Sequence, residues 1–136
     1  MATEAFFTSS AGELKLTDTG DIHRDLLNQV TRFVKMMVDT PAGPALRGII
    51  AAAQSDETVR QAFVEHYVSP RSQHGGAALR RAQQRGQITP DVNVRIVIDQ
   101  IWGACYYRLM TTPEEVDERY VRVLLEQTLG GVAVFA

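Results

Sequence analysis

The sequence has one cysteine among its 136 residues and no long apolar run. The lone Cys105 excludes a disulfide within the chain, and its apolar neighbours are typical of a small core residue. A transmembrane helix needs about 18 consecutive apolar residues, and no segment approaches that length. The first residues also lack the basic stretch and apolar core of a secretion signal. We therefore expect a protein of the cytoplasm that does not contact a membrane.

Concentrated positive charge is also scarce. The formal net charge is −2, and no segment gathers enough basic residues to neutralise several phosphates. The densest group, Arg80, Arg81 and Arg85, could reach an acidic partner, but on a helix this spacing favours a solvated face. This sequence is therefore not expected to bind DNA by itself.

Residues in catalytic or metal-binding patterns are missing as well. His23, His66 and His74 lack the spacing of metal ligands, and no nucleophile elbow or phosphate-binding loop is present. Asp18 and Asp25 lie around a helix start, where capping and the helix dipole already favour carboxylates. We therefore expect no enzyme, no metal and no cofactor.

The residues that are present predict an all-α fold of about five to six helices. Hydrophobic residues make up 45% of the chain and charged residues 22%, and the apolar positions recur every three or four residues. Pro70 should kink or divide the third helix, and Gly75 and Gly76 weaken it further. After an irregular opening, the first predicted helix covers 22–38, and a short second one carries Leu46, Ile49 and Ile50 and ends near Gln54. The third runs from Ser55 to Gly86. The fourth begins at Thr89-Pro90 or Asn93 and continues through Leu109, and the last runs from Pro113 to Gly130-Gly131.

The last two helices have more apolar surface than one small core needs. A second copy is the simplest cover for such a surface, so we expect a homodimer in which these helices form a four-helix bundle. Gly103 either lets helices approach across that seam or makes room for a large neighbour within the subunit. The residues predicted for the dimer interface are Ile101, Gly103, Tyr120, Leu124, Leu125 and Thr128.

A set of large and soft side chains, with a few polar ones among them, either fills the core or lines a pocket. Small-molecule sites in helical bundles are mostly apolar, with a few polar groups that orient the ligand. The candidate ligand-binding residues are Phe33, Met37, Phe63, His66, Tyr67, Trp102, Cys105 and Tyr106.

Three stretches together resemble the C-terminal domain of TetR/AcrR-family transcription regulators. The first is Asp18-Thr19-Gly20 followed by Asp25-Leu26. The second is Arg81-Ala82 with Arg85-Gly86, Ile88 and Asp91. The third is Gly103 with Tyr106-Tyr107-Arg108. Their order and spacing, more than any one of them, carry the resemblance over roughly residues 18–130.

The resemblance implies a TetR-type bundle that dimerises through its last two helices and binds a small, largely hydrophobic effector between the others. The expected function is effector sensing and dimerisation in a bacterial regulator, taken to be a repressor. The family's helix-turn-helix head is not in this sequence, so DNA binding would belong to that missing domain. The alternative is a stand-alone helical module that binds a protein partner. Residues 1–17 are expected to be a linker or the remnant of a connecting helix, 18–132 the domain, and 133–136 a tail.

Overall fold

The computed structural model describes residues 2–131, and these residues form helices and loops without a strand. The all-α prediction is confirmed, and the predicted tail at 133–136 lies outside the described residues. No helix in the described range is long and apolar enough to span a membrane. The elements are α1 (Ala2–Ser10), α2 (Ile22–Asp39), α3 (Ala42–Ala53), α4 (Glu57–Phe63), the π-helical turn η1 (Val64–Val68), α5 (Ser69–Gln84), α6 (Val94–Thr111) and α7 (Glu118–Gly130).

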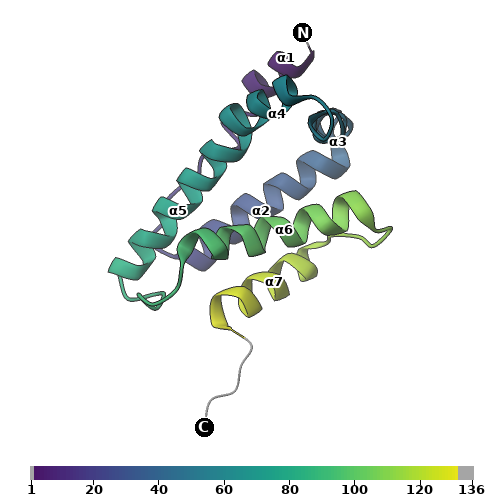
Figure 1. Ribbon diagram of the computed structural model, residues 1–136. Helices are drawn as coiled ribbons and strands as arrows, with labels where there is room; N and C mark the ends of the chain where they lie inside the picture. The colour runs from purple at the N-terminus through teal and green to yellow at the C-terminus, as the bar shows by residue number, and fades with distance from the viewer. Residues whose placement is uncertain (1, 132–136) are drawn as a thin grey trace.

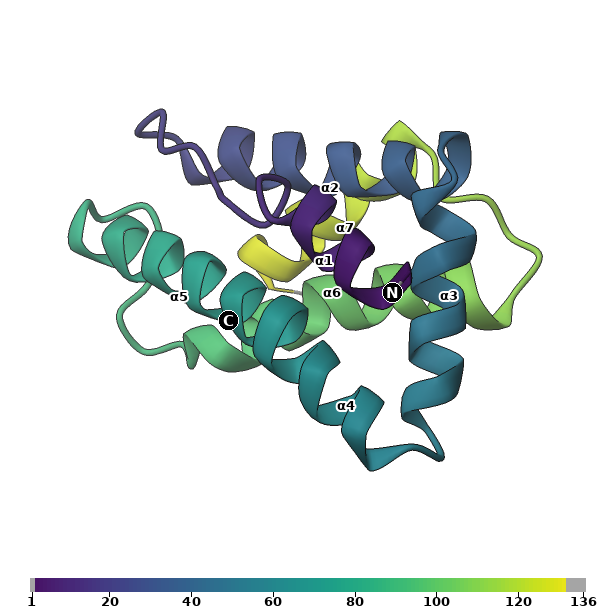
Figure 2. The same ribbon diagram turned by 90° about the horizontal axis from the view of Figure 1, so that it is seen from above.

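The helices enclose one core from several sides. Figure 2 shows α2, α3 and the continuous run α4–η1–α5 as three sides of a triangle, with α1 inside it. Helix α6 packs on α5, and α7 lies against both α6 and α2 (Figure 1). Counted with α4–η1–α5 as one run, residues 2–131 form six helices, within the predicted number.

Helix α2 follows directly from its sequence. The Asp21 side chain accepts a hydrogen bond from the Arg24 backbone N–H at 3.2 Å and so caps the helix. Leu26, Val30 and Phe33 recur at helical spacing and are fully buried. Each such side chain contributes roughly 1.5–3 kcal/mol by leaving water, so this face fixes α2 against the core.

Pro70 changes the type of helix rather than ending it. The residues before it widen into η1, where the Ser69 N–H bonds to the Val64 carbonyl five residues back. Proline has no N–H and crowds the preceding turn, and a wider turn accommodates both effects. The run then continues through α5, so Pro70 does not divide it, and the irregular turn lies before the proline rather than at the bend predicted for residues 69–76.

Three predicted boundaries are wrong. The irregular opening is helical as α1, because Phe6 and Phe7 are buried in the core. The third helix is capped by Asp56, which accepts from two backbone N–H groups, and not by Ser55. The last helix begins at Glu118 and not at Pro113.

The late start of α7 has a local cause. The Thr112 hydroxyl donates back to the Arg108 carbonyl and accepts from the Glu114 N–H, which makes a turn instead of a cap. The Asp117 carboxylate then accepts from the Tyr120 N–H at 2.8 Å and caps α7.

Candidate functional site

A buried arginine lies at the centre of the molecule, although charged side chains are rarely buried unless they are paired. Arg71 on α5 is 3% exposed. Its Nη2 donates to the two Glu13 carboxylate oxygens at 2.6 and 2.9 Å and to the Tyr67 hydroxyl at 3.0 Å. Glu13 lies between α1 and α2, so the ion pair ties that connecting segment to the middle of α5.

Aromatic rings surround the same guanidinium. Its central carbon lies 4.0 Å from the ring centroid of Trp102, 5.1 Å from that of Tyr67 and 5.2 Å from that of Phe33. A cation over a ring face, shielded from water, is stabilised by up to about 2 kcal/mol. These residues, which come from α2, η1, α5, α6 and the α1–α2 segment, are called here the Arg71 cluster: Glu13, Phe33, Tyr67, Arg71 and Trp102.

The cluster leaves three strong donors unused. Nε and Nη1 of Arg71 and Nε1 of Trp102 are buried and have no acceptor among the described residues. A buried donor without an acceptor costs about 1–3 kcal/mol, and more when it is charged. The cluster is therefore poised to gain free energy from any group that brings acceptors.

A cavity of about 230 Å³ adjoins these donors. It lies between α5 and α6 and is called here the α5–α6 cavity. Its wall combines apolar and aromatic side chains with the polar or charged Ser72, Arg95 and Asp99. The residues that line it are Val68, Arg71, Ser72, Arg95, Ile98, Asp99, Trp102, Gly103 and Tyr106.

The phenols at this site stay protonated near neutral pH. Burial raises the pKa of Tyr106 to about 12, and it raises the pKa of Tyr67 further, although Arg71 opposes both shifts. Burial alone would lower the pKa of Arg71, but Tyr67 and Glu13 reverse that effect. The site therefore offers a permanent cation and neutral hydroxyls to whatever enters the cavity.

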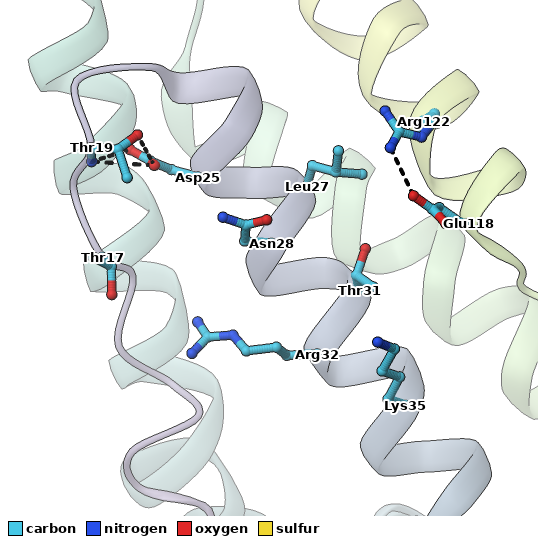
Figure 3. Close-up of a pocket in the computed structure, with 10 residues that line it drawn as sticks. All are labelled: Thr17, Thr19, Asp25, Leu27, Asn28, Thr31, Arg32, Lys35, Glu118 and Arg122. Carbon is cyan, nitrogen blue, oxygen red and sulfur yellow. Dashed lines mark hydrogen bonds and ion pairs between the residues drawn. The ribbon is translucent and has the colours of Figure 1, made fainter.

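Other hollows lie on the surface, and two of them are larger than the α5–α6 cavity by volume and differ in character. A polar groove of about 480 Å³ runs between residues 17–19, α2 and α7 (Figure 3). Its basic side chains are Arg32 and Lys35 on α2 and Arg122 on α7, and Asp25 turns toward Thr19 at its upper end. A broader, more apolar groove of about 680 Å³ lies between α1 and α4. Neither hollow has the combination of burial, rings and unused donors found at Arg71.

The structure brings half of the predicted ligand-binding residues together at the Arg71 cluster. Phe33 contacts both Trp102 and Tyr106 edge-on, with ring centroids 5.0 and 5.5 Å apart. Tyr67 contacts the guanidinium, and only Trp102 and Tyr106 of the predicted set line the cavity itself. Cys105 is fully buried in the core.

The other three predicted residues lie elsewhere. Phe63 stacks on the outer side of Tyr67, with ring centroids 5.6 Å apart. His66 is exposed, faces Phe7 and lines the groove between α1 and α4. Met37 is 2% exposed and fills the core near the end of α2. A helical face predicts that these side chains are near one another, but not which of them meets the cavity.

Arg71 was missed by sequence reasoning, although a signal was present. The buried residues of α5 include Gly75, Ala78 and Ala82, and Arg71 lies at the same helical spacing, four residues after Tyr67. An arginine on the buried stripe of a helix marks a buried ion pair or a ligand site, and both readings need a partner far away in sequence.

The predicted dimer residues divide into two groups. Ile101 and Leu125 are 0% and 2% exposed, so they are buried inside the subunit and offer no side-chain surface to a second copy. Gly103 is exposed, and Tyr120, Leu124 and Thr128 are half-buried. The larger apolar side chains exposed on these helices are ones the prediction omitted, namely Ile96, Tyr107 and Val123.

Two of the sequence motifs bind each other. The Asp18 carboxylate accepts from both Arg85 Nη atoms at 2.9 and 2.7 Å and lies 3.3 Å from Arg81 Nε. Hydrogen bonding from Arg85 holds the pKa of Asp18 well below its usual value. Arg81 and Arg85 remain 39% exposed, so they lie on a solvated face, and the acidic partner that they reach there is Asp18 of the same chain, 67 residues before Arg85.

A second contact joins the same two motifs. Gln87 Nε2 donates to the Gly20 carbonyl at 2.6 Å, and the buried Asp25 carboxylate accepts from the Thr19 N–H and hydroxyl. These contacts fix the start of α2 against the end of α5. The residues that make them are called here the hub: Asp18, Thr19, Asp25, Arg85 and Gln87. It locks these two segments of the chain together.

A family model for the tetracyclin repressor-like C-terminal domain matches residues 16–128 of this helical chain. The chain belongs to the TetR family. The matched range contains both the hub and most of the Arg71 cluster, and only Glu13 precedes it. The TetR-family proteins found by the comparisons are transcription regulators, which as a class are not enzymes.

Two TetR-family relatives extend the match over nearly the whole chain. The uncharacterized HTH-type transcriptional regulator YdeS of Bacillus subtilis (strain 168) is 26% identical over 129 residues. The crystal structure of the TetR family transcription regulator SCO0332 superposes with a TM-score of 0.89 at 38% identity, covering 98% of this chain and 75% of its own. The match with YdeS covers 95% of the present chain but only 65% of the length of YdeS.

Proposed function

We propose that this chain is the effector-sensing and dimerisation domain of a TetR-family repressor, acting in the cytoplasm. Regulators of this family act as dimers with small-molecule effectors. In this proposal residues 18–132 form the sensing domain, residues 1–17 connect it to a DNA-binding region, and the operator is read by that region. The single observation that carries the proposal is the ring-lined α5–α6 cavity beside a buried arginine with unused donors.

The effector site that we propose is this cavity. Its walls are side chains of two long helices, and ring-to-ring contacts through Phe33 and Trp102 connect it to α2. A ligand that wedges between α5 and α6 therefore acts on the packing of both helices. It shifts the regulator between two arrangements only as far as it binds one more tightly than the other.

The dimer surface that we propose is one face of α6 together with α7. Ile96, Gly103 and Tyr107 recur at helical spacing on α6, and the two side chains are 54% and 64% exposed. A Cβ added at Gly103 would meet nothing within 4 Å, so the backbone there is open to close approach by another helix. Val123 and Leu124 continue the apolar surface on α7.

Effector binding is tested through the only tryptophan in the chain, Trp102, which lines the cavity. Titration of a small-molecule library should change its fluorescence and raise the melting temperature for compounds that bind. The same compounds should release the complete regulator from its operator. The proposal fails if compounds that release the operator leave Trp102 fluorescence and the domain's melting temperature unchanged.

Dimerisation is tested with a matched pair of glycine variants. Gly103→Arg places a charge on the proposed seam, whereas Gly48→Arg places it on α3 at an equally open helical position. Sedimentation at micromolar concentration should show a dimer for the wild-type protein and for Gly48→Arg, and a monomer for Gly103→Arg. A dimer in all three proteins would place the interface elsewhere, and a wild-type monomer would overturn dimerisation by this domain.

A further inference from the structure

We infer that the effector is a small aromatic carboxylic acid, recognised by Arg71 and Trp102 and opposed by Glu13. This inference rests on the proposed effector-sensing function and names the chemical class of ligand for the same cavity. It starts from the buried donors of Arg71 and Trp102, two residues that adjoin the cavity, because a ligand of the wrong polarity that reaches them would leave them unsatisfied.

The donors select for an acceptor. Arg71 Nε and Nη1 and Trp102 Nε1 can only donate hydrogen bonds, and all three lack an acceptor among the described residues. Two of them belong to a permanent cation that is 3% exposed. Hydrogen bonds from such a cation to an anionic oxygen are roughly twice as strong as neutral ones, so a carboxylate fits better than an amide or alcohol.

The cavity also limits the body of the ligand. A volume of about 230 Å³ is smaller than typical drug-sized sites and suits one or two rings. The rings of Trp102 and Tyr106 line it together with Val68 and Ile98, and the charged Arg95 and Asp99, which lie 3.8 Å apart, line it as well. Flat aromatic groups pack well against such rings, and buried apolar contact supplies most of the binding free energy.

The contact with Glu13 shows that Arg71 can bind a carboxylate. It also explains how binding of an acid would change the fold. Glu13 occupies Nη2 from the opposite side and already neutralises the guanidinium. A second carboxylate at Nε or Nη1 shares that positive charge and is repelled by Glu13, so binding weakens the Glu13–Arg71 pair. Glu13 belongs to the segment that joins α1 to α2, which makes this connection the part of the fold that responds to the ligand.

The test compares acids with their neutral isosteres on the wild-type domain. Benzoate, phenylacetate and 2-naphthoate should bind at least about tenfold more tightly than benzamide, phenylacetamide and 2-naphthamide, the loss expected for one charge-assisted hydrogen bond. The single indole N–H resonance of Trp102 should shift on binding the acids. Equal affinities for the acids and amides, or no binding of any acid up to millimolar concentration, would overturn the inference.

Two variants separate recognition from general charge. Arg71→Met keeps the apolar stem and should abolish the preference for acids, while Arg80→Met, which removes an exposed charge of the same helix outside the cavity, should retain it. If Arg80→Met loses the preference as fully as Arg71→Met, general charge attraction explains the binding and the inference is wrong.

The Glu13→Gln variant provides a second test of the inference if Arg71→Met does not fold. Removing the competing charge should tighten acid binding several-fold and leave amide binding unchanged, and Glu65→Gln at an exposed position should change neither. Unchanged acid affinity in Glu13→Gln would mean that Glu13 does not compete. A structure of the wild-type protein with acid present that shows only a buried water at the donors would also contradict the inference.

Failure of the inference and failure of the proposed function can be told apart. If neutral apolar compounds shift Trp102 fluorescence and release the operator while the acids do not bind, the effector site stands and the ligand class is wrong. If the compounds that release the operator do so without any change at Trp102, the site itself is wrong.

Discussion

A series of Gly→Ala substitutions tests how closely the helices approach one another, because the three sites differ only in what the added methyl group meets. At Gly48 on α3 a Cβ would meet nothing within 4 Å. At Gly75 on α5 it would lie 2.5 Å from the tip of Ile98, a side chain that lines the α5–α6 cavity. At Gly43 it would lie 2.0 Å from the carbonyl oxygen of Met37.

The expected order of stability follows from two opposing terms. Replacing a helical glycine by alanine stabilises the helix by about 0.5–1 kcal/mol, and Gly48→Ala should gain that amount in full. Overpacking costs about 1–3 kcal/mol, and at Gly43 the obstacle is backbone that cannot rotate away. Gly43→Ala should therefore lower the unfolding free energy by about 2 kcal/mol, whereas Gly75→Ala should fall between them because Ile98 can change rotamer.

The assay is thermal unfolding at one fixed protein concentration, since a dimer's stability depends on concentration. For a chain of this size each kcal/mol corresponds to roughly 3–5 °C, so Gly43→Ala should melt about 6 °C or more below wild type and Gly48→Ala a few degrees above it. Gly75→Ala should also alter ligand affinity, because Ile98 must move. Equal melting temperatures for Gly43→Ala and Gly48→Ala would refute the close approach of α3 to the end of α2.

Three further predictions concern the charge, the thiol and a helix cap. Because the Arg85 hydrogen bond lowers the pKa of Asp18, its stabilising effect is present at neutral pH and lost as the pH falls below about 4. Asp18→Asn should therefore destabilise the protein at pH 7, and the gap to wild type should begin to shrink below about pH 4 but persist in part at pH 3, because the lowered pKa keeps folded Asp18 ionised there. The exposed Asp91→Asn should change little at either pH, and no destabilisation by Asp18→Asn at pH 7 contradicts the ion pair. Burial raises the pKa of Cys105 to about 12, so Ellman's reagent at pH 8 meets roughly one thiolate in ten thousand and should react on the timescale of unfolding. Reaction within minutes in native buffer would show that the thiol is accessible. Asn93 caps α6 through two backbone N–H groups, so calorimetry should find about 1 kcal/mol lost in Asn93→Ala and only a few tenths in Asn93→Gly.

Local sequence signals predicted those parts of the fold that depend on local contacts. Asp21 before α2 and Asn93 before α6 cap the helices that their positions indicate, and α7 ends at the expected glycines. The start of α7 was wrong because a threonine followed by proline and glutamate can form a turn as well as a cap. The turn forms here because the Thr112 hydroxyl donates a hydrogen bond back to α6.

The site was harder to predict because its partners are distant in sequence. The rings at positions 33, 67, 102 and 106 were predicted only as part of a set that fills the core or lines a pocket. In the structure Phe33 contacts Trp102 and Tyr106, and Arg71 links Tyr67 to Phe33 and Trp102. The pairing of Arg71 with Glu13 spans 58 residues and depends on how a loop crosses α5. No periodicity records such a pairing, so a charged residue on a buried stripe could be noticed but its partner could not be named.

The motifs that carry the family likeness explain why it identifies the fold more readily than the effector. Asp18 of the first motif bonds to Arg85 of the second, and Gln87, next to that motif, holds the Gly20 carbonyl. These residues satisfy one another and leave nothing free for a ligand. The unused donors belong to Arg71 and Trp102, which are outside the three motifs. The residues around Arg71 can therefore change without disturbing the hub, whereas Gly103 and Tyr106 of the third motif line the α5–α6 cavity and tie that part of the family pattern to the proposed site.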